Sequence, residues 1–510
     1  MYAKVKSLGI FGFETFLVEV EADISSGLPR FDIVGLPDAA VKESKERVRS
    51  SIKNCKFTYP TARITVNIAP ADIKKEGAIY DLPIFISTLL ASGQLNIKDI
   101  DEYAFIGEMS LDGEIRPVKA VLPMVVEAKK QGIKNVFIPK SNELEGGVID
   151  EICVLPVENI YQVCNHLKGI DKIAPAKTVT TEQNDESVLL DFSDVKGQEN
   201  AKRALEIAAA GGHNCIMYGP PGTGKSMLAK RMPSILPDMT FEEQIECTKL
   251  YSVAGKLDNK TGLITKRPFR SPHHTVSAQG LTGGGTSLTP GELSLAHNGV
   301  IFLDEFPEFD RRAKESLRQP LEDGIVTITR TSGTVTYPSN ILLIAAMNPC
   351  PCGYLGHPTK ECTCSDAVKR RYKEKISGPI LDRIDIHIEV APVAFDELSS
   401  TKKEESSKEI KKRVDKAREI QRKRFENTLV SCNAKMTPQM TKDFCKLNND
   451  AAQLLKDAFE KLSMSARAYD KILRISRTIA DLEESESIEI NHIAEALQYR
   501  GLDRQYNYCE

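Results

Sequence analysis

Short runs of β-branched and apolar residues alternate with stretches of helical periodicity in the first part of the chain. Residues 15–20 and 64–68 are rich in side chains that favour strands. Residues 120–131 have apolar positions at helical spacing, and Gly132 follows them as a helix stop. We therefore predict an α+β domain over residues 1–170.

The pattern changes at residues 171–189, which are rich in Thr, Lys, Glu and Gln and nearly free of large apolar side chains. Such a segment buries too little apolar surface to order itself, so we predict an interdomain linker. A second α/β pattern follows over residues 190–395. Residues 396–510 are predicted to be helical, with a densely charged stretch at 399–424 and a last amphipathic helix at 488–497.

Composition supports a multidomain globular protein, because 510 residues are too many for one hydrophobic core. The formal net charge is −3, so the protein as a whole is not a polycation that would attract nucleic acid. Basic residues gathered on one surface could still do so. No apolar run approaches the ~20 residues of a membrane helix, and the first residues lack a secretory pattern. We expect a cytoplasmic protein with mostly reduced thiols and no membrane partner.

A strand-like run at residues 214–218 leads into the sequence GPPGTGKS. Glycines let main-chain N–H groups turn toward phosphate oxygens, and the helix that follows adds a favourable dipole. Lys225 is predicted to reach the β- and γ-phosphates of ATP, and the Ser226 hydroxyl to bind Mg²⁺. The predicted ATP-binding loop consists of Gly219, Pro220, Pro221, Gly222, Thr223, Gly224, Lys225 and Ser226. A glycine turn that matched by accident would lack this strand–loop–helix order.

Two further apolar runs end in polar residues. Residues 300–303 lead into Asp304 and Glu305, and residues 341–346 lead toward Asn348. The carboxyl ends of buried parallel strands are where such sheets bind ligands. We expect Asp304 to hold Mg²⁺ through water and Glu305 to act as general base. Asn348 would hydrogen-bond the attacking water or the γ-phosphate, although an Asn after a strand is by itself usually a turn residue.

Four cysteines lie close together: Cys350 and Cys352, then, after nine residues, Cys362 and Cys364. Four thiolates suffice for one tetrahedral Zn²⁺, which would order a loop too short to form its own core. The C-x-C spacing is tighter than that of most zinc sites, and His357 is a possible substitute ligand. We predict a structural zinc site over residues 350–364.

These motifs together resemble the AAA+ ATPases of the magnesium-chelatase-like branch, and specifically the ComM/YifB family. The segments that carry the resemblance are residues 219–226, 269–274 (FRSPHH), 291–292, 296–299, 304–305 and 348–353. The resemblance covers nearly the whole chain. It implies an AAA+ P-loop core with an all-α C-terminal lid, and ATP and Mg²⁺ as cofactors.

The family pattern also implies arginines that act across a ring. Arg383 would be the finger that enters the neighbouring subunit's site, which implies a homo-oligomer, most simply a hexamer. Arg467 would contact the γ-phosphate from the lid, with Arg474 and Arg477 as nearby alternatives. A surface ion pair is the commoner role of an arginine.

Residues 267–291 depart from a minimal ATPase core, and in the resembled branch this region forms insertions that line the pore. Two adjacent histidines, His273 and His274, lie in it. Contact with substrate or metal and a capping or packing role are both open for them.

Residues 64–167 resemble the Lon-protease domain fold, of the ribosomal S5 domain 2-like type. A peptidase of that family needs a serine nucleophile and a lysine base. By the flanking residues, the serine position falls near Asp81 and the lysine position near Leu122. Ser87 and Lys119 lie close but out of register, so we expect a scaffold or substrate-contacting domain without protease activity.

Three functions compete. The resemblance implies a hexameric DNA motor that drives branch migration in homologous recombination and in the integration of transforming DNA, with branched or single-stranded DNA as partner. Basic residues at 369–375 and 408–424 are suited to phosphate contacts. Both clusters are equally typical of solvated helix faces, because acidic residues at 404–426 are interleaved with basic ones. A protein remodeller is the alternative. A magnesium-chelatase-type subunit is less favoured, because the chain shows no acidic integrin-like domain.

Overall fold

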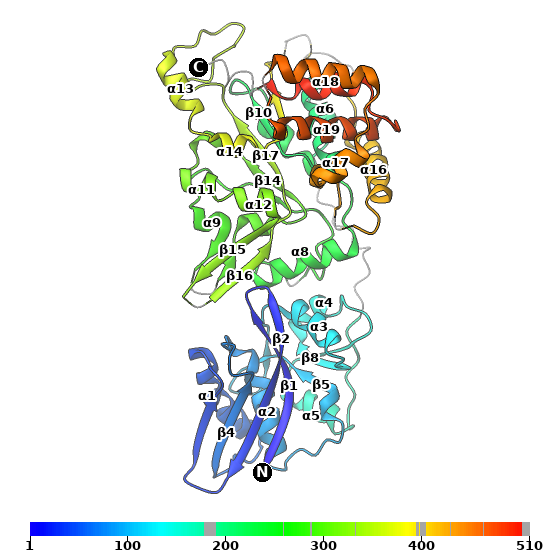
Figure 1. Ribbon diagram of the computed structural model, residues 1–510. Helices are drawn as coiled ribbons and strands as arrows, with labels where there is room; N and C mark the ends of the chain where they lie inside the picture. The colour runs from blue at the N-terminus through cyan, green and yellow to red at the C-terminus, as the bar shows by residue number, and fades with distance from the viewer. Residues whose placement is uncertain are drawn as a thin grey trace.

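The structure is a computed structural model that describes residues 1–177, 190–258, 260–285, 288–331, 333–393, 397, 404–428, 430–462 and 464–501. The molecule is elongated, with a front domain at one end, a second α/β domain in the middle and a helical bundle beside it (Figure 1). Most of the predicted linker lies outside the described residues, as do residues 398–403 and 502–510.

The front domain is built on a mixed sheet of seven strands, in the order β3-β4-β2-β1-β5-β8-β9. Its strands are β1 (Tyr2–Phe11), β2 (Glu14–Ser25), β3 (Arg30–Val34), β4 (Arg63–Ala69), β5 (Tyr103–Phe105), β8 (Asn135–Pro139) and β9 (Cys153–Val157). The helices of this domain are α1 (Ala39–Asn54), α2 (Asp81–Ala91), α3 (Val121–Lys130), α4 (Glu143–Gly146) and α5 (Ile160–Leu167). β1 and β2 form a long antiparallel hairpin, and alternate residues such as Val18 and Val20 enter the core.

The front domain continues past its predicted boundary at residue 170. The Ala176 N–H donates to the Val154 carbonyl oxygen at 2.8 Å. Ile173 and Ala176 pack against the front-domain core. These two apolar side chains cover the edge strand β9, so the first part of the predicted linker belongs to this domain's surface.

The second domain has a sheet of five strands in the order β11-β14-β17-β10-β18. Its strands are β10 (Cys215–Tyr218), β11 (Phe269–Arg270), β14 (Val300–Leu303), β17 (Leu342–Met347) and β18 (Ile386–Glu389). All neighbouring pairs are parallel, and the three central strands are fully buried. The strands predicted at residues 214–218, 300–303 and 341–346 are therefore present, and their carboxyl ends lie at one edge.

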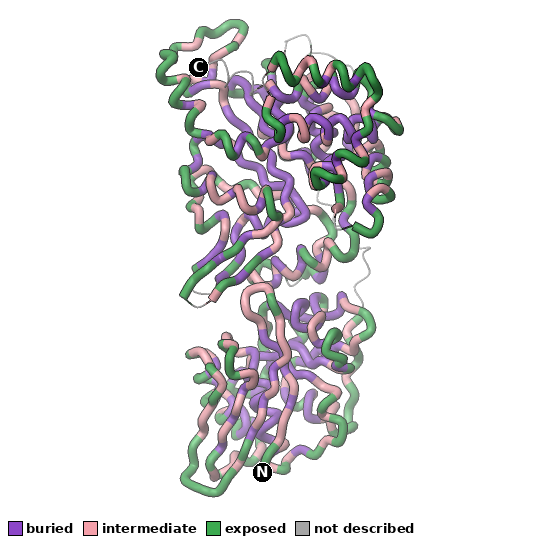
Figure 2. The backbone as a smooth tube through the Cα atoms, in the orientation of Figure 1, coloured by how far each residue is buried: buried purple, intermediate pink, exposed green. Residues whose placement is uncertain are grey.

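Helices and short hairpins surround this sheet. They include α6 (Glu199–Gly211), α7 (Lys225–Ala229), α8 (Phe241–Val253), α9 (Ala278–Thr282), α10 (Glu292–Leu295), α11 (Arg311–Glu315), α12 (Arg318–Asp323), α13 (Asp366–Lys373), α14 (Gly378–Leu381) and the hairpin of β15 (Ile325–Arg330) and β16 (Gly333–Pro338). Figure 2 shows buried residues running through the centre of both domains.

The C-terminal bundle consists of α16 (Ser407–Arg424), α17 (Pro438–Phe444), α18 (Asn449–Lys461), α19 (Ala466–Leu482) and α20 (Ile490–Gln498). Asn448 caps α18, because its side chain accepts from the Ala451 N–H at 2.8 Å. Ile472 and Ile475 share one hydrophobic core with Ile386 of the sheet. The bundle therefore packs as a continuation of the second domain.

Within the described ranges, the front domain contacts the second domain at the tip of its first hairpin and beside α3. At the tip of the β1–β2 hairpin, Phe13 packs edge-to-face on Tyr337 of β16, with ring centroids 6.1 Å apart. Beside α3, the buried Glu145 carboxylate accepts a hydrogen bond from the Ser252 hydroxyl of α8. Among the described residues, no helix is long and apolar enough to cross a membrane.

Candidate active site

Residues 219–226 form the loop between β10 and α7. Gly222 and Gly224 have φ angles of 80° and 90°, in the left-handed region where glycine is favoured. At Gly219 a Cβ atom would lie 2.2 Å from the Val390 carbonyl oxygen, so the close approach of β18 excludes a side chain there. The loop conformation is thus set by its glycines, as the sequence predicts.

Lys225 is the buried cation of this loop, with 8% of its surface exposed. Its Nζ donates to the Gly219 and Pro220 carbonyl oxygens at 2.7 and 2.8 Å, and to Asn348 Oδ1 at 3.5 Å. Burial lowers the pKa of the Lys225 ammonium below its ordinary value, and the nearby Asp304 carboxylate opposes that shift. Asn348 follows β17, the strand next to β10, so strand order brings it to the lysine.

The predicted Mg²⁺ ligands meet directly. The Ser226 hydroxyl donates to Asp304 Oδ2 at 2.6 Å, and the Glu305 N–H donates to Asp304 Oδ1 at 2.9 Å. A hydroxyl and a carboxylate at one point are the oxygen ligands that Mg²⁺ takes beside nucleotide phosphates. The two residues could therefore hold the ion.

Glu305 has a contact that sequence reasoning left open. Its Oε2 lies 3.2 Å from His274 Nδ1, and the His273 and His274 rings lie 4.1 Å apart. Glu305 also has a φ of 51°, which is unusual for a residue other than glycine. Strands β11 and β14 are parallel neighbours in the sheet, so the loops that follow them, which hold His274 and Glu305, lie at the same sheet edge. A correct prediction of this strand order would have indicated the contact.

The two predicted arginines have partners outside residues 219–226. The Arg383 guanidinium donates to the Glu322 carboxylate and, at 2.6 Å, to the Pro379 carbonyl oxygen. Arg467 is 64% exposed, and its Nη1 lies 4.0 Å from Asp382. Within the described residues, neither guanidinium donates to residues 219–226.

The alternatives Arg474 and Arg477 are engaged inside the helical bundle. Arg474 donates to the Ala434 carbonyl oxygen at 3.1 Å, and Arg477 donates to the buried Asp481 carboxylate at 3.0 Å. Both guanidinium groups are bonded within the helical bundle. Of the three candidate arginines of α19, Arg467 is the exposed one.

The four cysteines of residues 350–364 come together, with all their sulfur atoms within 4.8 Å of one another. A main-chain hydrogen bond at Tyr354 lowers the pKa of the Cys352 thiol to about 6. His357 Nδ1 instead accepts from the Thr359 and Lys360 N–H groups, so it is not part of the cluster. The cluster is suited to one metal ion.

The cysteine loop rests on the phosphate-binding loop. Gly353 has a φ of 84°, and a Cβ atom there would lie 2.7 Å from Pro221 Cδ. A metal that ordered residues 350–364 would therefore also support residues 219–226, the predicted phosphate-binding loop.

In the front domain, the residues predicted to stand at the positions of a Lon-type dyad are Asp81 and Leu122. Asp81 is buried and accepts from Arg47 Nε at 2.6 Å and from the Met109 N–H at 3.1 Å. Leu122, near the predicted lysine position, is a buried apolar residue. The Ser87 hydroxyl donates to the Ile84 carbonyl oxygen at 3.0 Å, and Lys119 is exposed.

Comparison with protein families finds three matches along the chain. The family "Magnesium chelatase, subunit ChlI" matches residues 191–398. "Subunit ChlI of Mg-chelatase" matches residues 20–142, and "Magnesium chelatase, subunit ChlI C-terminal" matches residues 404–500. The parallel sheet with its helical C-terminal region is an AAA+ magnesium-chelatase-like fold.

Individual relatives match over almost the full length. The YifB protein of Escherichia coli strain K12 is 43% identical over 96% of this chain and 94% of its own length. The competence protein ComM of Haemophilus influenzae is 42% identical over 98% of both chains. The magnesium-chelatase 67 kDa subunit of Heliobacterium mobile is 25% identical over 45% of this chain and 38% of its own.

Proposed function

This chain belongs to the ComM/YifB family of magnesium-chelatase-like AAA+ proteins, and we propose that it is an ATP-hydrolysing DNA motor. The observation that carries the proposal is the meeting of Lys225, Ser226, Asp304, Glu305 and Asn348 at the carboxyl edge of one parallel sheet. These residue types bind phosphate, hold Mg²⁺ and activate water in P-loop ATPases. The relative named as a competence protein supports a role with DNA.

Each group has a distinct task in hydrolysis. Lys225 exchanges its bonds to the loop carbonyl oxygens for bonds to the β- and γ-phosphates of ATP. Ser226 and Asp304 hold Mg²⁺, which neutralises phosphate charge when bound. Glu305 takes the proton of the attacking water, and Asn348 orients that water or the γ-phosphate.

A ring completes the proposed site. Arg383 would act on the γ-phosphate of the neighbouring subunit, and Arg467 on that of its own subunit from the lid. Arg383 is engaged with Pro379 and Glu322 and makes no hydrogen bond to residues 219–226 of its own chain among the described residues, which is compatible with a finger that acts in trans. Arg467 is exposed on α19, from which it would reach the γ-phosphate when the lid closes. We propose a homo-hexamer. Sizing by light scattering with and without ATP tests it, and a protein that stays monomeric with ATP bound would contradict it.

The four clustered cysteines are proposed to hold one structural Zn²⁺. Metal analysis of protein purified without chelator should give about one zinc per chain, and Cys362→Ser with Cys364→Ser should lose it. Cys432→Ser, a change at a free cysteine elsewhere, serves as the control. A folded protein without zinc would contradict the proposal.

DNA contact is proposed on α13, which directly follows the cysteine loop. Arg370 and Arg371 are exposed there, and the ion pair of Arg370 with Glu374 is long, at 3.9 Å. Such weakly paired guanidinium groups are free to bind backbone phosphates. Arg370→Ala with Arg371→Ala should weaken DNA binding and reduce its salt dependence. Lys456→Ala with Lys461→Ala, two exposed lysines of α18, is the matched control.

The decisive experiment is ATP turnover by the purified protein, alone and with single-stranded, duplex and four-way branched DNA. The proposal expects stimulation by DNA, strongest with branched DNA, and loss of all turnover in Lys225→Ala. Branch migration of a labelled four-way junction would then test the motor itself. Stimulation by unfolded protein instead of DNA would replace the proposal with a protein remodeller.

We also propose that the front domain is a scaffold without peptidase activity, since Asp81 and Leu122 occupy the dyad positions. Casein should stay intact with the wild-type protein. Cleavage that was lost in Ser87→Ala or Lys119→Ala would contradict this part of the proposal.

A further inference from the structure

A second pocket lies at the opposite edge of the five-stranded sheet from the phosphate-binding loop. Gly212, Gly299 and Ile341 line it, and they precede β10, β14 and β17 respectively. Its other wall is formed by the end of α16 and by residues 430–435. The pocket has a volume of about 520 Å³, which is within the range of small-molecule sites.

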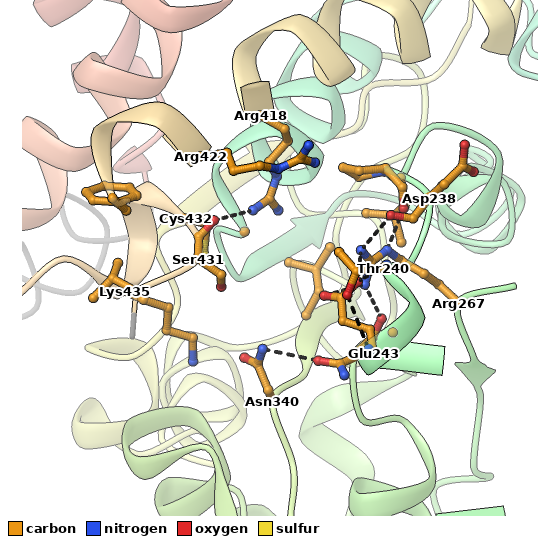
Figure 3. Close-up of a pocket in the computed structure, with 18 of the residues that line it drawn as sticks. Asp238, Thr240, Glu243, Arg267, Asn340, Arg418, Arg422, Ser431, Cys432 and Lys435 are labelled. Carbon is orange, nitrogen blue, oxygen red and sulfur yellow. Dashed lines mark hydrogen bonds and ion pairs between the residues drawn. The ribbon is translucent and has the colours of Figure 1, made fainter. Parts of the chain in front are cut away.

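Among the described residues, three cations of one wall form no hydrogen bond or ion pair with a carboxylate, and Asp415 of α16 acts on Arg422 only at longer range. Arg418 donates to the main-chain oxygens of Ala209 and Ser431, at 3.0 and 3.5 Å. Arg422 and Lys435 have no hydrogen bond or ion pair with any residue in the described part of the chain. Figure 3 shows these side chains grouped on one side of the pocket, away from Asp238 and Glu243.

The acidic side chains of the pocket are largely neutralised by other groups. Glu243 accepts from Arg267 Nη2 at 2.8 Å, and Arg267 also donates to the Pro237 and Asn298 carbonyl oxygens. Asp238 accepts from Lys411 at 2.5 Å. Glu426, just after α16, is exposed and offsets one of the three positive charges of that wall. The pocket therefore presents a net positive charge on the wall formed by α16 and residues 430–435.

The remaining lining suits a ligand with an apolar body as well as an anionic group. Leu236, Pro237, Phe425 and Val430 supply apolar surface, and Asn340 supplies an amide next to it. Arginine binds phosphate through a fork of parallel N–H groups, and lysine binds it as a point charge. A phosphate ester attached to a flat base has both features.

We infer that this pocket binds a phosphate ester, from a free nucleotide or from a nucleic-acid strand, through Arg418, Arg422 and Lys435. The site goes beyond the proposed ATPase, because it lies at the opposite sheet edge and shares no residue with the phosphate-binding loop. A ligand there would join the core sheet to α16, so its binding would stabilise the contact between the sheet and the helical bundle.

Calorimetry tests the inference on the full chain saturated with Mg-ADP, so that the first nucleotide site is already filled. The probes are thymidine monophosphate and a short oligothymidylate strand. The wild-type protein should bind at least one of them. Arg422→Ala with Lys435→Ala should weaken that binding by about tenfold or more, because two charged donors are lost.

Two control proteins keep the result interpretable. Arg422→Lys with Lys435→Arg preserves the charges and should retain most of the binding. Lys423→Ala changes an exposed lysine of the same helix that does not line the pocket, and should bind as the wild type does. Thermal unfolding of each variant without ligand confirms that it is folded.

The two probes separate the sources of the phosphate. Binding of the monophosphate that is lost in the double alanine variant assigns a free nucleotide, and binding of the strand alone assigns nucleic acid. No binding of either probe, or equal binding by the double alanine variant, would overturn the inference. DNA-stimulated ATP turnover is measured separately, so failure here leaves the proposed motor function to its own test.

Discussion

The two α/β domains of this chain differ in what their sheets bring together. At the carboxyl edge of the five-stranded sheet, Lys225 meets Asn348 and Ser226 meets Asp304. In the front domain, Asp81, predicted to stand near the position of a nucleophilic serine, is bound to Arg47. A sheet brings several loops to one edge, but the side chains on those loops determine whether the edge can bind a ligand or catalyse a reaction.

The two clusters also differ in how readily a ligand could enter them. Lys225 is held by main-chain carbonyl oxygens, which phosphate oxygens can replace. Asp81 is fully buried and bonded by a guanidinium and a main-chain N–H, so its partners are part of the domain's structure. We therefore expect substitutions at the first cluster to change activity and substitutions at the second to change stability.

The sharpest test of this contrast is Lys225→Ala. Loss of the phosphate-binding cation should lower ATP turnover by about a thousandfold, as when a main transition-state donor is removed. A coupled phosphate-release assay measures it, and Lys230→Ala, an exposed lysine after the same helix, should behave as the wild type does. Turnover close to wild type in Lys225→Ala would place hydrolysis elsewhere.

Glu305→Gln should lower turnover by about a hundredfold while ATP still binds, because a general base is lost and the phosphate ligands are kept. Single-turnover kinetics and nucleotide binding by calorimetry separate the two effects. Glu308→Gln removes a carboxylate that forms a surface ion pair with Lys375 and should leave turnover unchanged. If both variants were equally active, Glu305 would not be the base.

In the front domain, Asp81→Asn should destabilise the fold, because the half-buried Arg47 loses its charged partner. Breaking such a pair costs about 3 kcal/mol, which lowers the unfolding temperature of a domain this size by roughly 6–12 °C. Scanning calorimetry measures it, with the exposed Asp101→Asn as control. An Asp81→Asn variant with an unchanged unfolding temperature but no ATP turnover would contradict the expectation that Asp81 acts on stability alone.

The stability that Glu145, buried between the two domains, contributes to the folded protein should fall as pH rises. Burial raises the pKa of Glu145 above its ordinary value, so the folded protein binds more protons than the unfolded chain between the two values. Stability from this group is present at low pH and is lost as pH rises through the raised pKa.

In Glu145→Gln, the unfolding temperature should decrease less with rising pH than it does in the wild type. The expected difference between the two proteins is roughly 2–4 °C over this pH interval. Thermal scans over about pH 4–8 cover the interval of carboxyl titration. Glu143→Gln, whose carboxylate pairs with Lys140 at the surface, should retain the wild-type slope. An unaltered slope in Glu145→Gln would assign the pH dependence to another group.

Much of the fold was predictable because its signals are local. The strands at residues 214–218 and 300–303 are short apolar runs, and Asn448 caps a helix as its side chain suggests. The predicted linker was only partly right, since Ile173 and Ala176 pack on the front domain and cover an edge strand. Whether a segment packs against a sheet edge depends on which strand forms that edge, and the composition of the segment does not predict the strand order.

The sequence by itself determined the conformation of the loop at residues 219–226, because glycine spacing and the strand–loop–helix order are local properties of the chain. Only the tertiary structure decided that Asn348 reaches Lys225, that His274 contacts Glu305 and that Gly353 rests on Pro221. It also placed the cations of the second pocket on one wall. These contacts depend on which strands and loops are neighbours in space, and the packing of the whole domain sets that arrangement.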